Sequence, residues 1–288
     1  MPLCALVADP EVHRFALKIA YDGTKFWGTN PQPEKRTVYS EVRRAIRADG
    51  IELARPGIPF ASRTDKGVSA LGNCIVLDVT RPSRLDQLAP SLNAELEDIA
   101  VVGAAEVAEA FHPRRASMRV YRYALLAPES LDAARLREAG ALFVGTHNFQ
   151  AFARRDKKRH GKPHAYESTI ESVAVERQGP LVFITVRGTR FWWNQIRRMV
   201  PAMEAYARRE CSLEDLSGML EGRAPIKAAL KPAPPEPLIL LDIEYPGVTF
   251  DRKPLWLRPK EGWLRRLSVQ SASAQAFSHG LHGLLGRS

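Results

Sequence analysis

A single aspartate between two cations is the feature of the sequence that most suggests chemistry. Asp65 lies between Arg63 and Lys66, and Gly67 follows. Cations beside a carboxylate favour its ionised form, and an ionised aspartate can act as a nucleophile, a general base or a metal ligand. The alternative is a surface turn with a local ion pair, which such a composition often forms. The segment therefore offers a reactive group without fixing its reaction.

Aromatic and cationic residues alternate in a second segment. Arg119, Tyr121 and Tyr123 share one face if residues 118–126 form a strand. Aromatic rings beside a cation on a sheet can stack RNA bases, so this face is a candidate RNA-binding surface. The alternative is that these aromatic residues pack in a core, as they commonly do in strands.

Two further segments are basic. Arg197 and Arg198 follow an aromatic cluster at the expected start of a helix, and Pro201 lies inside that helix. A proline there removes the hydrogen bond to the carbonyl of Arg197, which predicts a kink. Residues 154–162 hold six cations and one acidic residue, which suits sequence-independent contact with phosphates. A solvated basic surface is the alternative for both segments.

Composition limits the class of protein. The 288 residues include 42 Lys and Arg against 32 Asp and Glu, a net charge of +10 that suits a polyanionic partner such as nucleic acid. A hydrophobic content of 45% excludes a largely disordered chain. No apolar run approaches the roughly 18 residues of a membrane span. Three dispersed cysteines fit neither a disulfide framework nor a zinc site, which predicts a reducing compartment.

Strand and helix patterns alternate along the chain. Strands are expected over 15–21, 74–79, 101–107, 118–126, 168–177, 181–188 and 238–245, with a hairpin at 178–180. Helices are expected over 38–46 after a Thr37 cap, over 85–92, after a Ser130 cap, over 196–207, and over 213–220 after a capping box of Ser212 and Asp215. This mixture favours an α+β fold with a largely antiparallel sheet. Residues 1–13 and 247–288 lack such patterns, which predicts an N-terminal extension and a weakly packed tail.

Taken together and in order, the segments resemble the TruA family of tRNA pseudouridine synthases. The resemblance runs from about Arg14 to Tyr245. It is carried by Tyr21–Gly28, Arg36–Val38 with Glu41, Arg63–Ala70, Arg119–Tyr123, Gly145–Phe149 with Phe152, and Phe191–Val200. The Arg63–Ala70 segment has the form typical of archaeal and eukaryotic members.

The resemblance implies a fold, a reaction and partners. The expected fold has two ferredoxin-like (RRM-like) halves, 14–110 and 111–246, whose sheets form one platform with the active-site cleft between them. The expected reaction is the isomerisation of uridine to pseudouridine in tRNA, around nucleotides 38–40 of the anticodon stem-loop. The sequence holds no motif for a nucleotide cofactor or a metal, and none is expected. Family members are commonly homodimers, and a cytoplasmic location is expected.

Residue roles follow from the same resemblance. Asp65 matches the essential aspartate, Arg197 its arginine partner, and Tyr121 the tyrosine stacked on the target base. Arg63 matches the residue that fills the space of the flipped nucleotide, which offsets part of the cost of unstacking. From residue type and charge rather than from the resemblance, Tyr123 is expected as a further RNA contact. Phosphate contacts are expected on the same ground from Lys66, Arg114, Arg115, Arg154, Arg155, Lys157 and Lys158. The aspartate either attacks the sugar or helps to eliminate the base and deprotonate C2′, and the sequence leaves both routes open.

Departures from the family pattern leave these groups in place. Ser62 stands where many bacterial members have Gly, residues 29–31 replace a Trp-Gln stretch, and Pro201 and Pro237 replace a small residue and a Gly. The competing hypothesis is a non-catalytic RNA-binding protein or tRNA chaperone on the same scaffold. A DNA-binding regulator is disfavoured, because the sequence has neither a helix-turn-helix nor a zinc motif.

Overall fold

The computed structural model describes residues 12–80, 85–154, 166–223, 225–227 and 231–263. The first half contains β1 (His13–Tyr21), α1 (Val38–Ala48), β2 (Ser69–Val79), α2 (Leu85–Glu95) and β3 (Ile99–Glu106). The second half contains β4 (Met118–Leu126), α3 (Ala133–Ala141), β5 (Gly145–Asn148), β6 (Glu167–Gln178), β7 (Leu181–Gly188), α4 (Gln195–Ala207), α5 (Leu213–Leu220) and β8 (Leu238–Glu244). Short 3₁₀ helices include η2 (Pro113–Arg115) and η4 (Pro254–Lys260).

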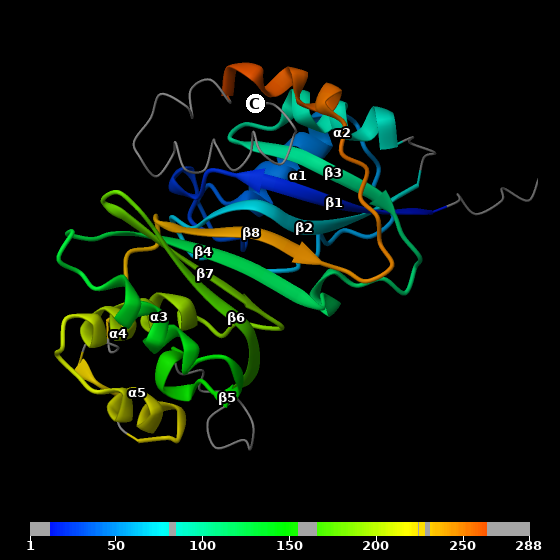
Figure 1. Ribbon diagram of the computed structural model, residues 1–288. Coiled ribbons are helices and arrows are strands. Elements are labelled where there is room, and N and C mark those ends of the chain that lie inside the picture. Colours follow the sequence, from blue (N-terminus) through cyan, green and yellow to red (C-terminus); the bar gives the residue numbers. More distant parts are fainter. Residues whose placement is uncertain (1–11, 81–84, 155–165, 224, 228–230, 264–288) are drawn as a thin grey trace, which may run out of the picture.

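These strands form one mixed eight-stranded sheet in the order β3-β1-β2-β8-β4-β7-β6-β5 (Figure 1). Neighbouring strands are antiparallel except β2 and β8, which are parallel where Ser69 and Ala70 face Ile239 and Leu240. The strand order within each half is that of a ferredoxin-like unit. In the first half, its second strand is reduced to isolated bridges from Leu53 and Phe60 to β2. The prediction of an α+β fold with two such halves joined into one sheet is confirmed.

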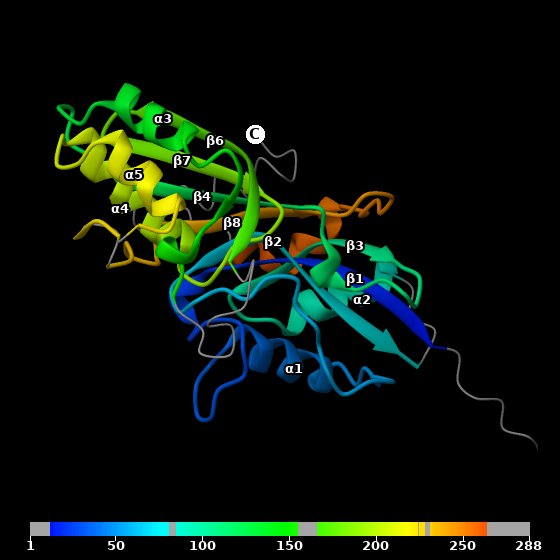
Figure 2. The same ribbon diagram turned by 90° about the horizontal axis from the view of Figure 1, so that it is seen from below.

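Helices of the two halves cover different parts of the sheet. In two views at right angles, α1 and α2 lie with β1–β3, whereas α3, α4 and α5 lie together beside β6 and β7 (Figures 1 and 2). The two halves meet where β2 lies beside β8. A residue on the loop before β2 and a residue on α4 can therefore face each other across this junction.

Local signals set the helix ends. Thr37 accepts a hydrogen bond from the backbone N–H of Ser40 in a capping box, as its position predicts. Ser212 and Asp215 form a second capping box at α5. The prediction that Ser130 caps α3 is wrong, because Asp132 accepts from the N–H groups of Ala134 and Arg135 instead. A carboxylate one residue before the helix reaches those orphan donors directly.

The segment after β8 is packed more tightly than the sequence suggests. Trp256 and Leu257 of η4 are 2% and 1% exposed, and Trp263 is 5% exposed. Buried Asn93 of α2 donates to the carbonyl of Trp256, and buried Lys260 donates to the carbonyl of Leu96. Desolvation lowers the pKa of Lys260 to about 8. The prediction of a weakly packed tail is therefore wrong for 254–263, and residues 264–288 lie outside the described part.

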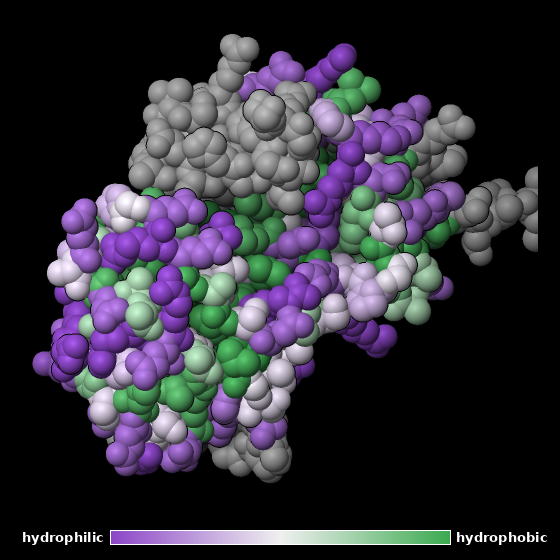
Figure 3. Space-filling model, in the orientation of Figure 1, coloured by the Kyte–Doolittle hydropathy of each residue, from purple (hydrophilic) through white to green (hydrophobic). Residues whose placement is uncertain are grey.

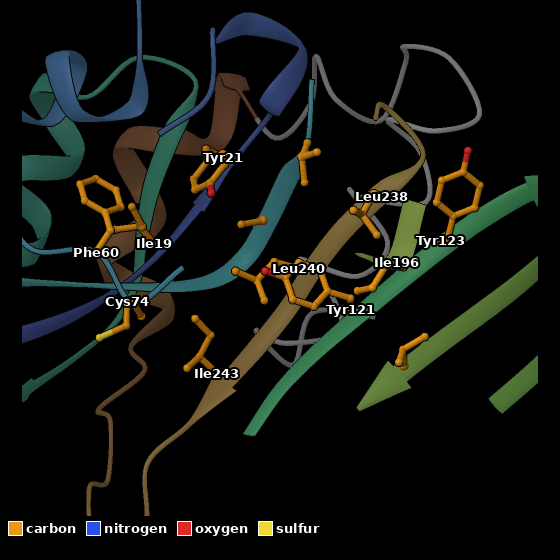
Figure 4. Packing of buried hydrophobic residues seen from close by; sticks show 14 of the residues in the cluster. Ile19, Tyr21, Phe60, Cys74, Tyr121, Tyr123, Ile196, Leu238, Leu240 and Ile243 are labelled. Carbon is orange, nitrogen blue, oxygen red and sulfur yellow. The ribbon is translucent and has the colours of Figure 1, made fainter. Parts of the chain in front are cut away.

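The main core runs through both halves. Figure 4 shows Ile19 and Tyr21 of β1 near the junction, with Tyr121, Leu240 and Ile243 continuing the apolar packing across β8 and β4. On the face seen in Figure 3, hydrophilic residues are interspersed with smaller hydrophobic patches. The continuous core gives the junction the stiffness that a site shared by two halves requires.

Candidate active site

A cavity of about 840 Å³ lies at the junction of the two halves. Its walls come from residues 27–32 and 61–68 of the first half and from residues 114–121 and 190–197 of the second. Six of the predicted site residues line it, namely Arg63, Asp65, Lys66, Arg114, Tyr121 and Arg197, as does Arg119 of the predicted stacking surface. The fold thus brings together six of the nine predicted site residues that lie in the described part, from segments that are far apart in sequence.

Asp65 and Arg197, which come from different halves, form an ion pair inside the cavity. Arg197 Nη1 lies 3.0 Å from Asp65 Oδ2, and the side chains are 14% and 33% exposed, respectively. This ion pair joins the loop before β2 to the first turn of α4. The carboxylate is therefore oriented by its partner and still open to a molecule in the cavity.

The aspartate loop is fixed by buried hydrogen bonds to two other segments. Thr29 N–H donates to the carbonyl of Thr64 at 3.2 Å, and Thr64 N–H donates to Thr29 Oγ1 at 3.1 Å. Asn73 on β2 is fully buried and donates to the carbonyl of Ser62 at 2.9 Å and to the hydroxyl of Tyr21 at 3.1 Å. The backbone on both sides of Arg63 is thereby tied to the body of the first half.

Two glycines allow this loop to pack closely. Gly28 has a φ of +87°, and a Cβ there would lie 2.7 Å from the carbonyl oxygen of Thr64. Gly67 has a φ of +85° and closes the turn in which Val68 N–H donates to the carbonyl of Asp65 at 3.2 Å. Both positions need the left-handed backbone that glycine adopts without strain.

Tyr121 forms the floor of the cavity. Its hydroxyl lies 2.7 Å from Ser62 Oγ, and its ring meets Phe191 edge to face at 5.2 Å between centroids. Desolvation by burial raises the pKa of Tyr121, which keeps the phenol neutral. The ring is held in one orientation by contacts from both halves, with Ile196 and Leu240 beside it (Figure 4).

Tyr123 does not share this position. It is 3% exposed, lies within the main hydrophobic core and is absent from the cavity lining. Arg119 and Tyr121 are also buried, at 9% and 6%. The RNA contact at Tyr123 is therefore wrong for the described structure, whereas Arg119 and Tyr121 of the same predicted surface line the cavity. Strand periodicity places the three side chains on one face but does not say that the face is covered.

Arg197 is held from three directions. Its Nη1 also donates to Asn194 Oδ1 at 3.2 Å, and its Nε donates to the carbonyl of Ala233 at 2.7 Å. Asn194, the residue before α4, has a φ of 64° in the left-handed region, which is uncommon for a residue other than glycine. The guanidinium thus reaches Asp65 with two of its nitrogens already fixed.

Pro201 explains the contact with Ala233. A proline has no N–H, so the carbonyl of Arg197 receives no hydrogen bond from position 201 within α4. That carbonyl instead accepts a hydrogen bond from the N–H of Ala233 at 2.6 Å. α4 nevertheless continues from Gln195 to Ala207. Pro201 therefore leaves the carbonyl of Arg197 free to accept a hydrogen bond from Ala233, in the segment before β8.

The other predicted contacts lie at or beyond the rim. Arg63, Lys66 and Arg114 are exposed and line the cavity, whereas Arg115 is exposed and outside the lining. Arg154 stacks on Trp193, with its guanidinium carbon 3.9 Å from the ring centroid. Arg155, Lys157 and Lys158 lie outside the described residues.

Trp27 and Trp193 belong to the cavity residues that the sequence reasoning did not single out individually. They are 42% and 51% exposed and line the cavity from different halves of the molecule. Both lie in segments that carry the family resemblance, which could have drawn attention to them. Their exposure, however, cannot be predicted from residue type.

The lining is strongly cationic. Among its described residues, Asp65 is the one carboxylate beside six Lys and Arg side chains. No group of three or more His, Cys, Asp or Glu side chains that could hold a metal occurs in the described ranges. Within those ranges no helix is both long and apolar enough to span a bilayer. The cavity suits an anionic substrate that approaches one oriented carboxylate.

Comparisons with known proteins give a consistent result. A family model described as tRNA pseudouridine synthase matches residues 139–246. The tRNA pseudouridine synthase A of Pyrococcus abyssi is 39% identical over 82% of this chain and 86% of its own length. That of Thermococcus onnurineus is 39% identical over 94% of this chain and 100% of its own length. Among solved structures, a Cbf5-Nop10-Gar1 complex matches with a TM-score of 0.35 at 11% identity, over 65% of this chain and 44% of that chain, which is too low to bear on the fold.

Proposed function

Since this chain belongs to the tRNA pseudouridine synthase A family, we propose that it isomerises uridine to pseudouridine in tRNA with Asp65 as the essential carboxylate. As a pseudouridine synthase the chain is an isomerase. The observation that carries the role of Asp65 is its 3.0 Å ion pair with Arg197 at the junction of the two halves. One carboxylate, oriented and open to a cationic cavity, is what the chemistry requires.

The reaction rearranges one nucleotide without gain or loss of atoms. The N1–C1′ bond breaks, the uracil rotates, C5 bonds to C1′, and the C5 proton is lost as N1 gains one. A carboxylate can assist by attacking C1′, or by helping the base to leave and taking the C2′ proton. A side chain that is 33% exposed within the cavity can reach the sugar for either route.

The surrounding side chains fit the remaining tasks. Arg197 keeps the carboxylate oriented, and Tyr121 offers an immobilised ring face on which the target base rests. Arg63, exposed at the mouth, fills the space that a flipped nucleotide leaves. Flipping costs a few kcal/mol of stacking, and a cation in the gap offsets part of it. Lys66 and Arg114 contact the phosphates on either side.

Three finer features belong to the same proposal. The target uridines lie around nucleotides 38–40 of the anticodon stem-loop, the chain acts as a homodimer, and it works in the cytoplasm. The family resemblance supports all three, and the free thiols of Cys74 and Cys211 fit a reducing compartment. Sedimentation analysis of the purified chain, alone and with tRNA, tests the dimer.

The central test compares two aspartate variants. Unmodified tRNA transcripts are incubated with wild type, Asp65→Asn and Asp86→Asn, and pseudouridine is then mapped chemically. Asp86 is exposed and outside the cavity lining, so it controls for loss of a carboxylate. Wild type and Asp86→Asn should give the same signal at defined uridines, and Asp65→Asn should be slower by at least about 100-fold.

Other outcomes would reject parts of the proposal. Signal from Asp65→Asn at the wild-type rate would remove Asp65 from the chemistry. Signal outside the anticodon stem-loop would move the target. Tight binding of tRNA by wild type with no conversion on any transcript would favour the non-catalytic RNA-binding protein.

A further inference from the structure

Two of the tryptophans that line the cavity are exposed. Trp27 and Trp193 are the aromatic members of the exposed large hydrophobic residues in the described part, at 42% and 51%. Both line the cavity, one from each half. An exposed tryptophan costs hydration free energy, and a pair placed at one cavity points to a ligand that covers them.

Each tryptophan is joined to one partner of the central ion pair. Lys66, the residue after Asp65, lies over the Trp27 ring with its Nζ 3.6 Å from the centroid. Trp193 directly precedes Asn194, whose side chain accepts from Arg197. The backbone carbonyl of Trp193 accepts a hydrogen bond from the N–H of Arg154 at 2.8 Å. Each tryptophan thus lies close to one of the two charged groups, Trp27 through its ring contact with Lys66 and Trp193 through its place in the chain.

The surroundings of both rings favour a single-stranded nucleic acid. Cations lie over both rings, Lys35 and Lys66 over Trp27 and Arg154 over Trp193. They place positive charge where a phosphate would follow a stacked base. Aromatic rings interleaved with cations bind unstacked bases, because every base presents a π face and every linkage a charge. A duplex could not use these rings, because its bases are already stacked.

We propose that Trp27 and Trp193 stack the bases of the two nucleotides that flank the target uridine, one on each side. The proposal rests on the proposed function, because it takes the cavity centre as the site of the reacting nucleotide. With the target nucleotide flipped out and Arg63 in the space that it leaves, the two flanking bases rest on the tryptophans, and Asp65 reaches the sugar between them. The site therefore selects RNA whose target lies in a loop or a readily opened stem end.

The test measures binding separately from conversion. Asp65→Asn protein, which holds RNA without turnover, is combined with Trp27→Ala, Trp27→Phe, Trp193→Ala or Trp193→Phe. Dissociation constants are measured on the tRNA transcript that wild type modifies, and on two copies with an abasic nucleotide on the 5′ or the 3′ side of the target. Leu255→Ala, which removes an exposed apolar side chain outside the lining, is the control.

Each alanine variant should weaken binding of the intact transcript by about 5- to 100-fold, and each phenylalanine variant by much less. The effect of one tryptophan should vanish on the 5′ abasic transcript and that of the other on the 3′ abasic transcript, because ring and base act as a pair. Equal losses on intact and abasic RNA, or no loss in either alanine variant, would overturn the proposal.

A second probe keeps this result independent of turnover. Tryptophan fluorescence of the wild type should be quenched on titration with single-stranded oligouridine, and the quenching should fall in Trp27→Phe and Trp193→Phe. Quenching that is unchanged in both variants would also overturn the stacking role. If wild type converts no uridine in any transcript but these binding effects hold, the proposed function fails and the base-binding site stands.

Discussion

The first half of the molecule forms one wall of the cavity and holds Asp65 on a loop that buried, neutral hydrogen bonds fix in place. The second half forms the other wall and holds Arg197 in the first turn of α4. The aspartate loop has satisfied polar partners at Thr29, Thr64 and Asn73. The arginine wall instead collects unfavourable features. Asn194 is left-handed, Pro201 lies inside α4, and two arginines occupy a helix N-terminus, where the dipole disfavours cations.

This difference indicates a division of labour between the walls. Buried, fully paired networks stabilise and give one geometry. Local conformations that cost energy persist where the surrounding structure over-determines them, and they concentrate at functional sites. We expect substitutions of the buried residues that support the aspartate loop, but not of Asp65 itself, to lower stability more than rate. We expect substitutions around Arg197 to lower rate more than stability. The variants below test that contrast.

Removal of the Arg197 guanidinium should have the largest effect. Arg197→Met leaves Asp65 without its oriented partner, and we expect a loss of about 100- to 1,000-fold in kcat. Arg197→Lys should recover little, because one ammonium cannot reach Asp65, Asn194 and the Ala233 carbonyl together. Single-turnover rates on a tRNA transcript measure this, with Arg208→Met at the end of the same helix as control. Full recovery in the lysine variant would contradict the positioning role.

Loss of the buried amide at Asn73 should show mainly in stability. Asn73→Ala removes bonds to Ser62 and Tyr21 and leaves buried groups unpaired, which should cost about 2–3 kcal/mol of unfolding free energy. kcat below the melting transition should stay within about 3-fold, because Thr29 still holds the loop. Asn93→Ala, which removes an equally buried amide between β3 and η4, gives the matched stability loss. A large fall in kcat without a fall in stability would reverse the contrast.

The features that could be predicted from the sequence differ between these two walls. Thr37 and the Ser212–Asp215 box could be predicted because a cap is formed by residues three apart. Asp65 could be singled out because its flanking cations are adjacent in sequence. The grip of Ala233 on Arg197 spans 36 positions, and the left-handed Asn194 has no local signature. Tyr123 shows the same limit, because alternation gives the face of a strand and burial depends on what packs over it.

The tail illustrates the limit in the opposite direction. Residues 254–263 lack a regular apolar period, yet Trp256 and Trp263 are buried against the first half. A few large side chains are enough to anchor such a segment when a complementary surface already exists on α2 and β3. Periodicity detects a helix or strand with an apolar face of its own. It misses a segment that is held by a few large side chains packed against other elements.

Pro201→Ala should have the smallest overall effect. It is informative because kcat should fall while thermal stability does not. Pro201→Ala supplies a backbone N–H that competes with Ala233 for the carbonyl of Arg197. Proline is far less favourable than alanine in a helix interior, so thermal stability should stay level or rise. Loosening one hydrogen bond of the grip should lower kcat by about 2- to 10-fold. KM for tRNA should not change, because the RNA-facing rim is untouched. Melting curves and single-turnover rates check both halves of this expectation.

The chain contains a matched control for this substitution. Pro90 lies inside α2, is half-buried like Pro201, and lies outside the cavity lining. Pro90→Ala should shift the melting temperature in the same direction and leave kcat as in wild type. A fall in kcat for Pro201→Ala alone would separate the freed Arg197 carbonyl from general relief of a helix. Equal rates in the two variants would show that the carbonyl of Arg197 can accept from both Ala233 and the N–H that Pro201→Ala supplies without loss of rate. The Ala233 contact would then not set the position of Arg197.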